Sequence, residues 1–131
     1  SQRFPYVVLD LCDKKLIEFP LSTVRLLNLN IPVAGGGYLR FLPFNFIKWS
    51  LKRINDEEDR PFVLYIHPYE ISFNEIYFWD VNKNFRLKSH AFFQNIGRRN
   101  ILKKLEILLK EFKFFLMKEV LSKIDSGGVK I

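Results

Sequence analysis

Two short stretches near the N-terminus consist mainly of β-branched, aromatic and leucine residues. These are residues 6–10 and 16–19, and the charged residues 13–15 separate them. Short runs of this composition between turn-forming residues are typical of β-strands, so we expect a strand in each. Residues 23–29 are also apolar, but their pattern fits a strand and a helix equally well.

Apolar residues recur every three to four positions in two longer stretches, which is the spacing of a buried helix face. The first follows Pro43, a favourable first helical residue, and predicts a helix that ends near Asp56. Its apolar positions are Phe44, Ile47, Leu51 and Ile54. The second predicts a helix whose apolar positions are Ile101, Leu105, Leu108, Leu109 and Phe112. Glu106 and Lys110 stand at the supportive i,i+4 spacing on its polar side.

Between these helices, residues 62–66 form an unbroken apolar run that predicts a strand buried on both faces. The order of strand, helix and buried strand is the pattern of a βαβ unit with a parallel sheet, so we expect an α/β fold. Residues 71–93 are aromatic and irregular and predict a long loop, whereas residues 114–117 predict a closing strand followed by a turn of helix through Leu121. We expect one domain over residues 1–125 and a flexible tail over residues 126–131.

The composition supports one packed domain, because 131 residues with 48% apolar side chains suffice for a single core. The net charge of +7 is compatible with a nucleic acid, an anionic polysaccharide, a membrane surface or an acidic partner. Cys12 is the only cysteine, which excludes an intrachain disulfide, and we expect it to be a small core residue. The basic residues of the late helix, Arg98, Arg99, Lys103 and Lys104, are expected on its solvated face.

The sequence contains neither a signal-peptide pattern nor an apolar run of the about 20 residues that cross a membrane. The chain begins at Ser1 and not at a methionine, so we expect it to be a segment of a longer protein. The compartment therefore stays open between the cytoplasm and the cell envelope.

His67 is the most prominent candidate for chemistry, since it follows the predicted strand 62–66 and precedes Pro68. Histidine is the usual proton-transfer residue near neutral pH, and Glu70 or Tyr69 could orient its ring or a substrate. The alternative is a structural histidine that is hydrogen-bonded at the end of a strand.

A second candidate is the triple glycine at residues 35–37, which Arg40 follows closely. Glycine permits close backbone approach, and a guanidinium can bind a carboxylate through two hydrogen bonds. A tight turn that enters the Pro43 helix explains the glycines equally well. A metal site within the chain is not expected, because the only histidines are His67 and His90, far apart in sequence. We expect His90 in a loop or on the surface.

The aromatic residues Tyr77, Phe78 and Trp79 are compatible with stacking on bases or sugars, although burial is the more common outcome for such side chains.

Three segments together resemble the C-terminal portion of bacterial polysaccharide deacetylases. They are Ile-Glu-Phe-Pro-Leu-Ser-Thr at residues 17–23, Gly-Gly-Gly-Tyr-Leu-Arg-Phe-Leu-Pro at residues 35–43, and Arg-Pro-Phe-Val-Leu-Tyr-Ile-His-Pro-Tyr-Glu-Ile at residues 60–71. The chain is similar in particular to the extension domain of uncharacterised function in deacetylases linked to exopolysaccharide synthesis and exosortase systems. This resemblance implies part of a distorted (β/α) barrel of the NodB-like carbohydrate esterase type, with parallel strands and two amphipathic helices.

The resemblance also implies an activity, which is the removal of acetyl groups from N-acetylated sugars. In such enzymes a divalent metal, usually zinc, activates water, an aspartate acts as base, and a late histidine protonates the departing amine. By order and context His67 matches that histidine. The metal ligands and the aspartate lie in the N-terminal half of the family, so this chain should bind no metal and should be inactive alone.

The function expected from the sequence is therefore the C-terminal part of a polysaccharide deacetylase, whose partners are the N-terminal half and an N-acetylated polysaccharide. We expect His67 to be catalytic, with Glu70 orienting it. The substrate-binding residues expected are Arg40, Tyr38, Gly36, Gly37 and Tyr69. Two alternatives remain, namely a non-catalytic carbohydrate-binding or assembly module, and a basic nucleic-acid-binding domain.

Overall fold

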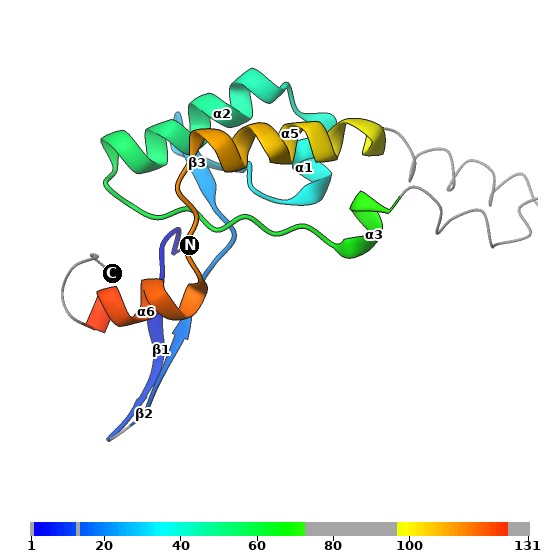
Figure 1. Ribbon diagram of the computed structural model, residues 1–131. Coiled ribbons are helices and arrows are strands. Elements are labelled where there is room, and N and C mark those ends of the chain that lie inside the picture. The colour runs from blue at the N-terminus through cyan, green and yellow to red at the C-terminus, as the bar shows by residue number, and fades with distance from the viewer. Residues whose placement is uncertain (1, 13, 73–96, 126–131) are drawn as a thin grey trace, which may run out of the picture.

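The computed structural model describes residues 2–12, 14–72 and 97–125. Its elements follow in the order β1 (Tyr6–Leu11), β2 (Lys14–Glu18), β3 (Thr23–Leu26), β4 (Leu29–Pro32), α1 (Gly36–Phe41), α2 (Phe44–Lys52), the π-helical turn η1 (Arg53–Glu57), α3 (Pro68–Ile71), α5 (Arg98–Glu111) and α6 (Met117–Asp125). Figure 1 shows α1, α2 and α5 gathered at one end, while the β1–β2 hairpin extends away from them with α6 at its side.

The strands form two separate antiparallel hairpins. In the first, Tyr6 pairs with Glu18 and Leu11 with Lys14, and a bulge lies between Val7 and Leu9. In the second, Thr23 pairs with Pro32 and Leu26 with Leu29. Leu27 and Asn28 join β3 to β4 with φ angles of 46° and 67°, the left-handed pair that a two-residue hairpin turn requires. The strands expected at residues 6–10 and 16–19 are thus confirmed.

The expected α/β fold, a partial (β/α) barrel with parallel strands, is wrong. The described residues contain two small two-stranded antiparallel sheets and helices, without parallel strands. The physical reason lies in the length of the connections between the strands. Parallel pairing requires a connection of a dozen or more residues, whereas two residues join β1 to β2 and two join β3 to β4. Each strand therefore pairs with its immediate neighbour in sequence.

The buried strand expected at residues 62–66 is also wrong. The segment is extended, but only Tyr65 forms a bridge, with Gly35, and Tyr65 is 48% exposed. With a single isolated bridge and no strand assigned beside it, the segment covers the core with some of its side chains instead of forming part of a sheet. Phe62, Leu64 and Ile66 are the apolar side chains that pack against it.

The core lies between the second hairpin and the helices α1, α2 and α5. Its buried side chains are Val24, Val33, Ala34, Leu39, Ile47, Leu51, Ile54, Leu108 and Phe112. The two amphipathic helices are therefore confirmed, and the first continues into η1. An ion pair between Lys48 and Glu111 joins α2 to α5 at the surface.

Several smaller predictions differ from the structure. The closing strand expected at residues 114–117 is absent from the described chain, where α6 begins at Met117 after an extended link. Cys12 is exposed and not a core residue, because the tight β1–β2 turn carries it outward with a φ of 42°. Residues 73–96, which include His90 and Tyr77, Phe78 and Trp79, lie outside the described residues, as does the tail at 126–131. No described helix is both long and apolar enough to cross a bilayer.

Candidate functional site

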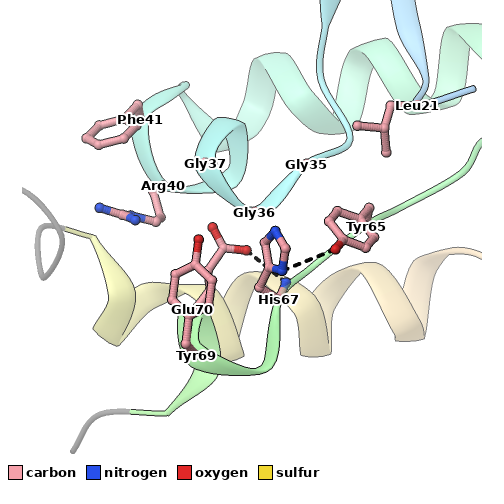
Figure 2. A pocket seen from close by; sticks show the side chains of 10 residues that line it. All are labelled: Leu21, Gly35, Gly36, Gly37, Arg40, Phe41, Tyr65, His67, Tyr69 and Glu70. Atoms are coloured by element: carbon pink, nitrogen blue, oxygen red, sulfur yellow. Dashed lines mark hydrogen bonds between the residues drawn. The ribbon is translucent and has the colours of Figure 1, made fainter. Parts of the chain in front are cut away.

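A hollow of about 520 Å³ lies where α1, the extended segment 62–66 and α3 meet. Figure 2 shows the side chains around it. Its lining consists of Leu21, the glycines Gly35, Gly36 and Gly37, Arg40 and Phe41 of α1, and then Tyr65, His67, Tyr69 and Glu70. The hollow therefore unites the two segments that the sequence marked as candidates.

Backbone hydrogen bonds hold those two segments together. The N–H of Tyr65 donates to the carbonyl of Ala34 at 2.8 Å, and the N–H of Gly36 donates to the carbonyl of Tyr65 at 2.9 Å. Beyond Gly36 the chain enters α1, so the glycines begin a short helix and do not form a turn into the Pro43 helix. The position of Tyr65 against the glycines is thus determined by the main chain and does not depend on its side chain.

His67 stands at the N-cap of α3, directly before Pro68. Its Nδ1 lies 3.1 Å from the hydroxyl of Tyr65, within hydrogen-bond distance. The imidazole meets the Tyr65 ring edge-on, with 4.6 Å between centroids, and stacks on the Tyr69 ring at 5.0 Å. Two aromatic rings and one hydrogen bond therefore restrict the rotation of the histidine ring.

Glu70 is a buried carboxylate in the wall of the hollow, with only 4% of its surface exposed. Its Oε2 accepts a hydrogen bond of 3.0 Å from the backbone N–H of His67. This bond satisfies one of the free amides at the start of α3. Glu70 therefore orients the main chain of His67, whereas the partner of the His67 ring is the Tyr65 hydroxyl.

A buried arginine supports the same wall from behind. Arg98, in the first turn of α5, is 2% exposed, and its guanidinium lies 5.4 Å from the centroid of the Tyr69 ring. The prediction of a solvated basic face holds for Arg99 and Lys103, which are exposed. It is wrong for Arg98 and Lys104, because α5 packs against both α1 and α3. The ammonium of Lys104 donates a hydrogen bond to the carbonyl of Leu39 in α1. Burial lowers the pKa of Lys104.

Of the site residues predicted from the sequence, six line the hollow. They are His67, Glu70, Arg40, Gly36, Gly37 and Tyr69. Tyr38 is not among the lining residues, and its half-exposed ring lies against Gly35. The roles assigned to these residues stay predictions.

Three lining residues were not singled out from the sequence, namely Leu21, Phe41 and Tyr65, whereas Gly35 belongs to the triple glycine already named as a candidate. One of them was accessible to sequence reasoning, because residues i and i+2 of an extended segment point to the same side, which places Tyr65 beside His67. The other positions depend on how separate segments pack, and nothing local in the sequence indicates them.

A bound metal needs a set of ligand side chains that lie close together. No three His, Cys, Asp or Glu side chains lie together for metal binding anywhere in the described ranges. In the hollow the potential ligands are His67 and Glu70, and the Glu70 carboxylate is bonded to the main chain at one oxygen. The arrangement can hold a polar ligand against Arg40 and the imidazole, with aromatic rings at its side.

No curated protein and no solved structure matches this chain. A family model does match, over residues 1–122. That match takes in the glycine segment, the extended segment with His67, and α5. The chain therefore belongs to the family described as Domain of unknown function (DUF3473).

Proposed function

We propose that this domain is the C-terminal part of a metal-dependent polysaccharide deacetylase and that its hollow forms one wall of the active site. The observation that carries the proposal is the placement of His67, whose ring borders an open hollow opposite Arg40 while its main chain is held by Glu70. A general acid needs this combination of access to a ligand and fixed orientation.

In the proposed reaction His67 acts late. As an imidazolium it donates its Nε2 proton to the departing amine nitrogen of the sugar when the acetamide bond breaks. Arg40 binds the sugar through hydrogen bonds to its oxygens, and the exposed ring of Phe41 borders the same space. By the resemblance to polysaccharide deacetylases, the metal that activates water would belong to the N-terminal half, and the described residues of this chain hold no group of three metal ligands.

The test uses the complete enzyme, in which this domain is joined to or mixed with the metal-binding half. Acetate release from N-acetylglucosamine oligomers is measured for the wild type and for His67→Ala, together with the metal content. Turnover should fall by about 10²- to 10⁴-fold, the usual contribution of a general acid, with metal content unchanged. Lys52→Ala, an exposed change on α2, is the control. Equal turnover of His67→Ala and the wild type would contradict the proposal.

A second candidate is a non-catalytic carbohydrate-binding or assembly module. Its support is the partly exposed aromatic rings of Phe41, Tyr65 and Tyr69 around the hollow, since such rings stack on sugars. Calorimetric titration of the 131-residue chain with N-acetylglucosamine oligomers, without added metal, distinguishes this binding module from the deacetylase part proposed above. Binding that Phe41→Ala weakens, together with no effect of His67→Ala on turnover of the complete enzyme, would favour the binding module.

A further inference from the structure

We propose that Tyr65 is a positioning residue for His67. Its hydroxyl occupies Nδ1 of the imidazole, so that Nε2 is the nitrogen that exchanges a proton with a ligand in the hollow. This inference rests on the proposed role of His67 as general acid and adds the residue that sets the orientation of its ring.

The first support is that Tyr65 is held in place independently of its side chain. Its N–H donates to the carbonyl of Ala34, and its carbonyl accepts from the N–H of Gly36. The phenol therefore projects from a fixed main-chain position. Because this main-chain position does not depend on His67, the tyrosine side chain can hold the neighbouring imidazole from a separate attachment point.

The second support is the geometry around the imidazole. The Tyr65 hydroxyl lies 3.1 Å from Nδ1, and the edge-on contact with Tyr65 and the stack on Tyr69 restrict the tilt of the ring. Figure 2 shows the second ring nitrogen of His67 directed toward the glycine segment, on the side of the hollow. The hydrogen bond at one nitrogen of a histidine decides which proton the other nitrogen carries.

The proton balance follows from the hydroxyl, which can donate and accept. In the neutral ring the proton sits on Nδ1 and the Tyr65 hydroxyl accepts it in a hydrogen bond, so that Nε2 carries the lone pair on the side of the hollow. In the imidazolium both nitrogens carry protons, and the hydroxyl accepts from Nδ1–H. When the Nε2–H bond breaks and the amine nitrogen gains that proton, Nδ1 keeps its proton in the bond to Tyr65. A hydronium ion from the solvent then returns a proton to Nε2 and leaves as water.

The direct test is the ¹⁵N spectrum of the imidazole nitrogens in the 131-residue chain at alkaline pH, where imidazole is neutral. The chain has two histidines, and a His90→Gln variant assigns the signals of His67. We expect the Nδ1–H tautomer in the wild type and a loss of that preference in Tyr65→Phe, which keeps the ring and removes the hydroxyl. Tyr69→Phe is the matched control, since Tyr69 contacts the imidazole through its ring face, and its tautomer should match the wild type. A dominant Nε2–H tautomer in the wild type, or the same spectrum in Tyr65→Phe, would overturn the proposal.

The kinetic test uses the complete enzyme and separates this inference from the proposed function. Tyr65→Phe should lower kcat by about 5- to 10-fold, the effect of one hydrogen bond, and leave KM unchanged. If His67→Ala lowers turnover and Tyr65→Phe does not, the role of Tyr65 is refuted and the general acid stands. If His67→Ala has no effect, the general acid is refuted, and the tautomer spectra still decide whether Tyr65 positions the ring.

Discussion

A Cβ atom on Gly36 would lie 1.8 Å from Oε2 of Glu70. The buried carboxylate thus occupies the space that a side chain at position 36 would need. The same oxygen accepts the hydrogen bond from the His67 main chain. Gly36 is therefore the position at which close backbone approach is required, and it connects the glycine segment to the orientation of His67.

Gly36→Ala should destabilise the domain by about 2 kcal/mol or more, because the methyl group must displace a buried carboxylate that is hydrogen-bonded. Gly37→Ala is the matched control in the same helix. A Cβ at Gly37 meets nothing within 4 Å, and alanine is the better helix former by about 1 kcal/mol. Urea unfolding of the two variants checks this, and equal effects would contradict the close contact at Gly36.

Glu70→Ala alone should lower stability by about 1–3 kcal/mol, since it leaves the His67 N–H without its partner. It should also remove the cost of Gly36→Ala, because the oxygen that the new methyl group meets is gone. Unfolding free energies of the two single variants and the double variant form a cycle, with an expected coupling of about 1–3 kcal/mol. Additive effects would show that the carboxylate and Gly36 are not in contact.

Gly97 precedes α5 with a φ of 77°, a conformation that is unfavourable for residues with a side chain. Gly97→Ala should cost about 1–2 kcal/mol. Gly97→Asn adds a Cβ at the same place, 3.1 Å from the Arg40 carbonyl, but asparagine tolerates the left-handed conformation. The thermal unfolding temperature should therefore be highest for the wild type, lower for Gly97→Asn and lowest for Gly97→Ala. Equal losses for both variants would assign the effect to the contact with Arg40.

Lys110 lowers the pKa of Glu106, first through the hydrogen bond of 2.9 Å that it donates and then through its charge. Because the folded pKa lies below the unfolded value, the stability from this pair is present above the unfolded pKa and is lost as the pH falls through the folded one. Lys110→Ala should raise the pKa of Glu106 toward its usual value. It should also remove the small part of the stability loss at acid pH that comes from this pair. A carboxyl ¹³C titration measures this, with Lys52→Ala as control.

The Glu106–Lys110 pair is largely exposed. About 1 M salt should therefore reduce the difference in the Glu106 pKa between the Lys110→Ala variant and the wild type. A Glu106 pKa that is the same with and without Lys110 would mean that the two side chains do not pair in solution.

The local elements could be read from the sequence because their signals are local. The apolar positions from Phe44 to Ile54 lie on one helix face, and the face that they predict is the buried one. The same holds for Ile101 and Leu108 in α5. The prediction for residues 62–66 was wrong for a different reason. A continuous apolar run indicates that a segment is covered, but it does not indicate whether neighbouring strands or other elements cover it. Its apolar side chains pack against the core without a strand on either side.

For the candidate site, the sequence by itself determined which residue types stand at the ends of the two segments, the glycines with Arg40 and His67 with Glu70. Only the tertiary structure decided that these segments meet and that Glu70 fills the space above Gly36, where its carboxylate bonds to the His67 main chain. The physical reason is that periodicity and turn chemistry act over a few residues, whereas the meeting of distant segments depends on the pairing of backbone groups across the core. Here two hydrogen bonds, from Tyr65 to Ala34 and from Gly36 to Tyr65, make that connection.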